Sequence, residues 1–333
     1  MGRAGFNRKT ALATATMTLA AEAPDLDVFT GFGGRVFGFA HHRGFTHSFL
    51  GLIPVCAVVV GIIYLLWLMR GRVTRNPDLP PRWGLLFLFA YTAGLSHILL
   101  DYTNGYGVRP FWPFWEKWYS GDIVFIAEPL LWIALTAGLV LPGFFALIGQ
   151  EVGDRRPGLR GRMAAILALA AMVLLWGVRD FEHRRALAAL RARTYESADA
   201  LRVGAYPTYV NPFTWYGVVE TRDFFALTEV DSLRPEIDPR AKMEILYKPE
   251  ETSITLAAKR SYLGRVYLDW AAFPITETTT RPDGGWIVEF HDLRFEGPLR
   301  VGGRHPLAAG VSLNREGKVQ AEFMGPVPQP APD

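Results

Sequence analysis

Histidine and acidic side chains, the residue types that bind metal ions, gather in four short segments near the start of the chain. These segments are 24–27, 41–48, 97–101 and 122–128. Imidazole nitrogens and carboxylate oxygens together suit zinc, manganese or iron better than magnesium or calcium. Zinc is the expected ion, because hydrolytic sites combine such ligands with an open position for water.

His97 and Asp101 are four residues apart within an apolar segment. In a helix this spacing places both side chains on one face, about one turn apart, where they can bind the same ion. An ionisable group that faces lipid at the centre of a membrane costs roughly 3 kcal/mol or more, so such groups face the bundle interior and have partners. The pair is therefore expected to lie inside the protein.

The expected site residues divide into metal ligands and catalytic groups. The ligands, for one to three ions, are Asp27, His42, His47, His97, Asp101 and Glu128. Asp25 is expected to act as general base, and Arg43 to steady a phosphate oxygen through two hydrogen bonds. Asp25 and Asp27 could exchange roles, because either carboxylate can bind the ion.

Each segment also has an interpretation without a metal. Two acids after a proline are common in solvated turns, and a His-Arg pair at a membrane edge can contact lipid headgroups. His97 and Asp101 could form a structural hydrogen-bonded pair, and Glu128 could pair with Arg109 or Lys117. A single site is preferred, because it explains all four segments together. Three other histidines stand alone among polar residues and are expected at the surface: His183, His291 and His305.

Long uncharged runs fill the first 178 positions, which predicts a membrane protein. A spanning helix needs about 20 mostly apolar residues to cross a hydrocarbon layer about 30 Å thick. Four segments meet this requirement: 49–69, 83–102, 123–149 and 163–178. A fifth segment, 10–23, is short and resembles either a signal peptide or a retained helix. A retained helix is favoured, since the leucine-rich core of a signal peptide is missing.

Arginine residues gather in the loops 70–82 and 155–162, which predicts that both loops are cytoplasmic. Segments 25–46 and 104–122 then lie outside, together with the chain that follows Arg179. All four ligand segments fall toward this outer side of the inner, cytoplasmic membrane. The arginines between 179 and 193 oppose the usual charge bias, although long translocated domains obey it less strictly.

Residues after Arg179 mix charged, aromatic and turn-forming types. The pattern predicts a juxtamembrane helix over 179–203, a small β-rich domain over 204–325 and a proline-rich, disordered tail over 326–333. Strands are expected at 215–221, 253–257, 262–268 and 285–291. The fold class is thus a mainly α polytopic membrane bundle of four or five transmembrane helices over 1–178, with a C-terminal α+β extramembrane domain.

Composition excludes several classes of protein. The single cysteine, Cys56, lies in an apolar run, so neither a disulfide framework nor a cysteine-based zinc site can form. A formal charge of +3 is small for 333 residues, and the arginines stand beside apolar runs. This pattern suits membrane topology rather than nucleic-acid binding. Membrane lipids are the expected partners, and the sequence does not indicate an oligomeric state.

Three strings together resemble the YdjM-type membrane-bound metal-dependent hydrolases. They are Pro24-Asp25-Leu26-Asp27, His42-Arg43-Gly44-Phe45-Thr46-His47-Ser48, and His97-Ile98-Leu99-Leu100-Asp101 followed by Thr103, Gly105, Gly107 and Pro113-Phe114. The resemblance covers roughly 10–132 and implies a polytopic membrane protein with a zinc-type hydrolase site. It also implies a distant similarity to zinc-dependent phospholipase C and the S1/P1 nucleases, whose His-x-x-x-Asp helix His97 and Asp101 match.

The chain departs from this family pattern at two places. Members carry a Thr-His pair before the first helix, where this sequence has Met1-Gly2-Arg3. The resemblance therefore implies either a start that differs from the one given or a chain that binds fewer ions. Members are also expected to carry Asp where Glu128 stands, which is a mild chemical change.

Two functions from different classes are consistent with these residues. The first is a metal-dependent hydrolase at the outer face of the membrane, acting on a phosphoester or other ester of a lipid-like substrate. The second is a non-catalytic membrane protein that binds, senses or transports a metal ion. Ligands near one membrane edge count against transport, which usually places its site near the midplane. Haem ligation is weaker still, since only His97 lies well inside a span.

Overall fold

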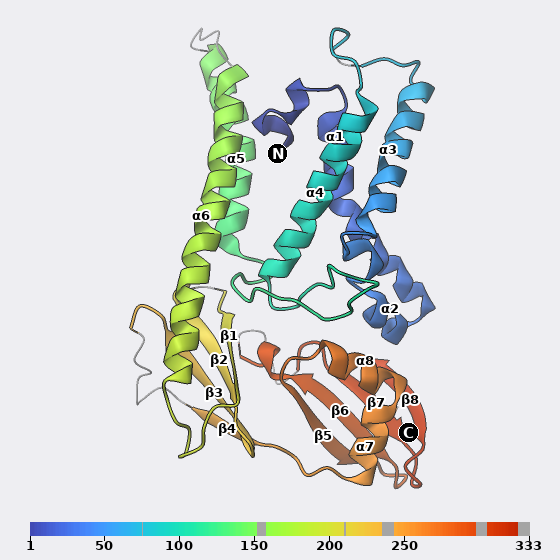
Figure 1. Ribbon diagram of the computed structural model, residues 1–333, viewed down its shortest axis with the longest axis vertical. Coiled ribbons are helices and arrows are strands. Elements are labelled where there is room, and N and C mark those ends of the chain that lie inside the picture. The colour runs from blue at the N-terminus through green and yellow to red at the C-terminus, as the bar shows by residue number, and fades with distance from the viewer. Residues whose placement is uncertain (75, 152–157, 210, 235–242, 298–304, 326–333) are drawn as a thin grey trace. The chain divides into compact units, whose positions relative to one another are not determined.

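A computed structural model describes residues 1–74, 76–151, 158–209, 211–234, 243–297 and 305–325 (Figure 1). The chain forms two compact units that interleave along the sequence. The first comprises Met1–Val28 and Arg43–Asp180, and the second comprises Phe29–His42 and Phe181–Asp333. The predicted tail over 326–333 lies outside the described residues.

The described part of the first unit is helical. Its helices are α1 (Ala13–Glu22), α3 (Leu52–Met69), α4 (Trp83–Thr103), α5 (Pro129–Glu151) and α6 (Gly158–Arg191), which continues into the second unit. The short 3-10 helices η3 (Ala23–Gly33) and η4 (Phe45–His47) precede α3. Helices α3 to α6 are long and apolar enough to cross a membrane, which confirms the predicted helical membrane region. The ten residues of α1 are too few to meet that requirement.

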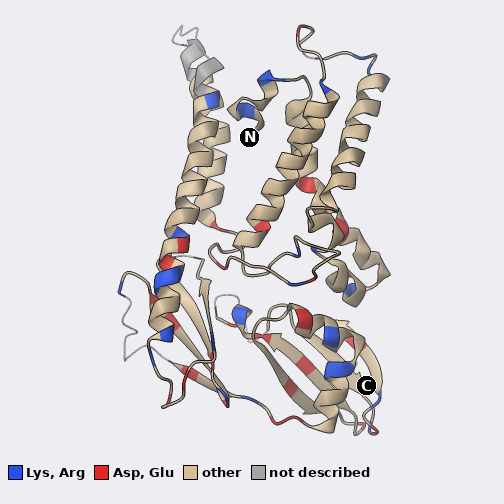
Figure 2. Cartoon of the chain, in the orientation of Figure 1, with Lys and Arg blue, Asp and Glu red and all other residues tan. Residues whose placement is uncertain are grey.

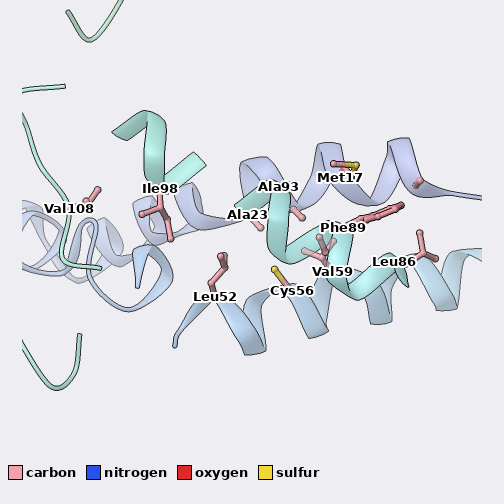
Figure 3. Close-up of a cluster of buried hydrophobic side chains, with 13 residues drawn as sticks. Met17, Ala23, Leu52, Cys56, Val59, Leu86, Phe89, Ala93, Ile98 and Val108 are labelled. Atoms are coloured by element: carbon pink, nitrogen blue, oxygen red, sulfur yellow. The ribbon is translucent and has the colours of Figure 1, made fainter. Parts of the chain in front are cut away.

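Small and apolar side chains hold α1, α3 and α4 together (Figure 3). Leu52 and Cys56 of α3 and Ala93 of α4 are fully buried in this core, together with Met17 of α1. Gly94 permits the closest approach, since a Cβ there would lie 2.5 Å from Cδ1 of Leu52. This contact lies one helical turn before His97 and five residues after His47, so it brings the two histidine-bearing segments together.

Charged residues are sparse along the membrane-spanning helices (Figure 2). Lys and Arg of the N-terminal segment and of the loop between α3 and α4 lie at one end of these helices (Figure 2). The segment before α3 and the C-terminal end of α4, which carry the predicted ligands, lie at the opposite end (Figure 1). The arginine-rich loop and the ligand segments are therefore separated by the length of the bundle.

Two four-stranded antiparallel sheets make the second unit β-rich, as predicted. The first sheet has the order β1 (Arg202–Pro207), β2 (Thr214–Glu220), β3 (Phe224–Asp231), β4 (Glu244–Tyr247). The second has the order β5 (Pro274–Thr280), β6 (Trp286–Asp292), β7 (Ala309–Leu313), β8 (Val319–Met324). Helix α2 (Arg35–His41) belongs to this unit, because the ring of Phe39 packs edge-on against Trp270 at 5.2 Å.

Two predicted strands are helices in the structure. Segments 253–257 and 262–268 form α7 (Ser253–Arg260) and α8 (Tyr262–Trp270). Thr252 accepts a hydrogen bond from the backbone N of Thr255 in a capping box, and Ser261 caps α8 by accepting from the backbone N of Gly264. These two N-caps outweigh the β-branched and aromatic content that suggested strands.

Candidate metal centre

Four side chains from three segments bring one ligand atom each to a common centre: Asp25 on η3, His47 on η4, and His97 and Asp101 on α4. The Nε2 atoms of the two histidines are 3.2 Å apart. Oδ2 of Asp101 lies 3.3 Å from each of these nitrogens. Oδ1 of Asp25 lies 3.5 Å from Nε2 of His47 and 3.3 Å from Nε2 of His97.

These distances match the edges of a tetrahedron around a metal ion. Ligand atoms about 2.0–2.1 Å from a tetrahedral zinc lie roughly 3.3 Å from one another. The five distances given above run from 3.2 to 3.5 Å. Two imidazoles and two carboxylates are also a donor set that zinc accepts. The four residues therefore fit a divalent metal ion.

The local backbone explains how His47 reaches this centre. Oγ of Ser48 donates to the carbonyl of Phe45 and accepts from the backbone N of Gly51, both at 2.9 Å. These bonds close a tight turn immediately before α3. A Cβ at Gly51 would overlap the carbonyl oxygen of Phe45, so the turn requires glycine. His47 is held at the end of this turn with its side chain fully buried.

Asp27 lies behind His47 and orients its ring. Oδ2 of Asp27 is 3.2 Å from Nδ1 of His47 and accepts a 2.7 Å hydrogen bond from the backbone N of Arg43. A carboxylate at Nδ1 favours the tautomer whose Nε2 can bind a metal. The structure therefore places Asp25 among the four ligand atoms and Asp27 behind one of them, which is the exchange of roles that the sequence left open.

Replacing Asp27 by Asn is expected to weaken zinc binding about 10- to 100-fold, the usual effect of losing such a supporting carboxylate. The measurement is a zinc competition with a chelating dye, on purified protein in detergent. Asp78→Asn is the matched control, because Asp78 is exposed in the loop before α4. Equal zinc affinities of the Asp27→Asn variant and the control would contradict the orienting role.

Arg43 orients the carboxylate of Asp101, as Asp27 orients the ring of His47. Its Nη2 donates to Oδ1 of Asp101 at 2.7 Å, and its Nη1 donates to Asn104 at 3.3 Å and to the carbonyl of Gly107 at 3.2 Å. The guanidinium also lies 4.8 Å from the ring centre of Tyr106. Only 7% of Arg43 is exposed. These contacts make Arg43 a positioning residue for Asp101, and its expected hydrogen bonds to a phosphate oxygen stay a prediction.

Two predicted ligands are not in this four-residue group. His42 follows α2 and belongs to the second unit, and it is not in the four-residue group. Glu128 is buried, with Oε2 3.8 Å from Nη2 of Arg179. Arg179 is itself fully buried, and its Nε donates to the carbonyl of Ile123 at 2.9 Å. Arg179, one of the arginines that oppose the charge bias, therefore neutralises an acid inside the first unit.

The carboxylates around His47 hold positive charge in the metal-free site. Burial lowers the pKa of His47, but its hydrogen bonds to Asp101, Asp25 and Asp27 outweigh burial and raise the pKa from 6.5 to about 10. Hydrogen bonds to His47 and His97 hold the pKa of Asp25 far below its usual range. The surrounding carboxylates therefore favour the protonated form of His47 when no metal ion is bound.

Zinc binding is expected to strengthen as pH rises, because the ion must displace this proton. With a folded-state pKa near 10 for His47, the apparent zinc affinity should increase about tenfold per pH unit between pH 6 and 8 for each proton released. Competition titrations at three pH values measure this slope. An affinity that stays constant over this range would contradict the account.

The metal-free protein should show the opposite trend in stability. The pKa of His47 is raised on folding, so its contribution to the free energy of unfolding is complete below pH 6.5 and is lost as pH rises through about 10.

A second group of potential ligands was not predicted from the sequence. Glu277, His291 and His305 offer ligand atoms that all lie within 4.8 Å of one another. The expectation that these histidines are surface groups is wrong for His291, which is 1% exposed. His183 is also half-buried, with its ring 5.1 Å from that of Trp215. The alternating apolar residues Trp286, Val288 and Phe290 place His291 on the opposite face with Glu289, so the pattern gave no signal for its burial.

The sequence is similar to known proteins over most of its length. A family model described as YdjM inner membrane protein matches residues 2–186, which include all four residues of the candidate metal centre. The chain is also 23% identical over 323 residues to the uncharacterized protein YfhP of Bacillus subtilis (strain 168), covering 95% of this chain and 86% of that protein. No solved structure matches the chain.

Proposed function

The chain belongs to the family of YdjM inner membrane proteins, and we propose that it is a metal-dependent hydrolase of the zinc type. The proposed substrate is a phosphoester or other ester of a lipid-like molecule, cleaved at the outer face of the inner membrane. The observation that carries this proposal is the tetrahedral set of four ligand atoms with one exposed member.

Exposure differs sharply among the four ligands. The side chain of Asp25 is 54% exposed, whereas those of His47, His97 and Asp101 are 0%, 15% and 14% exposed. Water and substrate therefore reach the centre past Asp25. Catalytic zinc sites have three protein ligands and an open position for water, so water would enter either as a fifth ligand or in the place of Asp25, the accessible member of the four.

The chemistry follows from this arrangement. A bound zinc ion supplies Lewis acidity that brings the pKa of water near 7 and polarises the scissile group. His47, His97 and Asp101 would hold the ion, while Asp27 and Arg43 fix the orientation of His47 and Asp101. Asp25 has two oxygens, of which Oδ1 faces the histidines. We assign to its second oxygen the acceptance of a proton from the attacking water.

An aromatic groove in the first unit supports a lipid-like substrate. It has a volume of about 660 Å³, and its lining includes Phe49, Phe111, Trp112 and Trp115. The backbone N of Phe49 donates to the carbonyl of Pro110 at 2.9 Å, which joins the groove to the segment that carries His47. We assign this groove to an acyl chain of the substrate, because Phe49 in its lining follows the ligand His47 by only two residues.

The test is hydrolysis of phospholipids and generic phosphodiesters by purified zinc-loaded protein. Activity should appear with zinc, disappear with a chelator and return when zinc is added back. Right-side-out vesicles should cleave substrate supplied from outside. Zinc-replete protein that hydrolyses nothing across the panel would overturn the proposal.

Asp25→Asn separates the two roles of Asp25. The amide retains an oxygen ligand but cannot accept a proton as a base, so zinc should stay bound while activity falls about 100-fold or more. Loss of zinc together with activity would show that Asp25 acts only as a ligand.

A non-catalytic metal-binding protein is the second candidate function. One observation favours it: four protein ligands can complete a tetrahedral zinc without leaving a position for water. Zinc bound at full occupancy by a protein that is inactive on every ester of the panel would favour binding, sensing or transport.

A further inference from the structure

The second group of potential ligands lies on one face of a sheet in the second unit. Strands β5 and β6 are antiparallel neighbours, with Ile275 opposite His291 and Glu277 opposite Glu289. Residues directly opposite each other point to the same face, and so do residues two apart on one strand. Glu277 and His291 are therefore diagonal neighbours on one face. Their positions are fixed by the register of the sheet.

His305 joins this pair from the segment that precedes β7. The ring centres of His291 and His305 are 3.8 Å apart, so the two imidazoles are in contact. Glu277, His291 and His305 also line a cavity of about 430 Å³ with Glu296. Three ligand atoms within 4.8 Å of one another thus surround a space that can hold an ion.

The acids around this cavity supply orientation and charge. Oε1 of Glu296 lies 2.7 Å from Nδ1 of His305, and Glu296 is only 7% exposed. This is the carboxylate–histidine arrangement that orients metal-binding imidazoles, as Asp27 does at the first centre. Glu289 lies directly opposite Glu277 in the register of β5 and β6, so a further acid stands on this face of the sheet.

We infer that Glu277, His291 and His305 form a second binding site, for a divalent transition-metal ion such as zinc. Two imidazoles and one carboxylate are the ligand set of several known zinc sites, with a fourth position left open. The ion would tie β5 and β6 to the segment before β7. This inference uses none of the residues of the first centre and does not depend on the proposed hydrolase activity.

The experiment uses the full chain in detergent, with the first centre removed by His47→Ala and His97→Ala. This background should still bind about one zinc ion per chain, and zinc should raise its thermal midpoint. Adding Glu277→Gln or His305→Gln should lower the remaining zinc affinity about tenfold or more. Glu277 is exposed and His305 is half-buried, so neither change disturbs the core as a substitution of His291 would.

Glu229→Gln is the matched control, because Glu229 is an exposed acid on β3 in the same unit. His305→Gln removes no carboxylate, so its effect separates the loss of a ligand from the loss of an acidic charge. The inference is overturned if the background variant binds no zinc. It is also overturned if Glu277→Gln and His305→Gln both retain the zinc affinity of the Glu229→Gln control.

Discussion

His47→Ala and His97→Ala are each expected to remove the ion from the candidate metal centre. Structural zinc sites bind with about 10–16 kcal/mol in total, so one of four ligands contributes roughly 2.5–4 kcal/mol. Losing either histidine should therefore weaken this site about 100- to 1,000-fold. Elemental analysis of purified protein measures the effect, as one ion fewer per chain than in the wild type.

His41→Ala is the matched control, because His41 is an exposed histidine outside the four-residue group, and its Nδ1 contacts the backbone carbonyl of Phe37 at 2.9 Å. Its metal content should equal that of the wild type. Unchanged metal content in both the His47→Ala and the His97→Ala variants would refute the site.

Arg179→Met is expected to destabilise the first unit by about 3–5 kcal/mol, the usual cost of leaving the partner charge buried and uncompensated. Methionine fills a similar volume but leaves Glu128 without this cation and the carbonyl of Ile123 without this donor. The measurement is the free energy of unfolding in mixed detergent micelles.

Two further variants make this prediction specific. Arg191→Met changes an exposed arginine at the C-terminal end of α6 and should alter stability by less than about 0.5 kcal/mol. Adding Glu128→Gln to Arg179→Met should recover part of the loss, because it removes the buried charge. A cost below about 1 kcal/mol for Arg179→Met, or no recovery in the double variant, would contradict the buried pair.

Residues close in sequence were the part of the site that could be predicted. His97 and Asp101 share a helix face because a spacing of four fixes it. The sequence placed His47 at the same end of the bundle as that pair, but it did not predict the contact between them. Which of Asp25 and Asp27 faces the metal centre could not be predicted, because it depends on which carboxylate accepts a hydrogen bond from the backbone N of Arg43.

Contacts between residues far apart in the sequence could not be predicted. Glu128 and Arg179 are 51 positions apart, on segments that come together only in the folded unit. The contact of His291 with His305 depends in the same way on the folding of β6 and β7 into one sheet. The prediction of strands at 253–257 and 262–268 was wrong for a local reason. Thr252 and Ser261 are N-caps that start helices there, and the β-branched and aromatic content of the segments does not reflect them.

The most direct test of the central claim is an experimental structure of the zinc-loaded protein, with anomalous diffraction at the zinc edge. We expect an anomalous peak about 2.0–2.2 Å from Nε2 of His47, Nε2 of His97 and one carboxylate oxygen each of Asp25 and Asp101. A structure without a peak among these four residues, at full zinc loading, would contradict it.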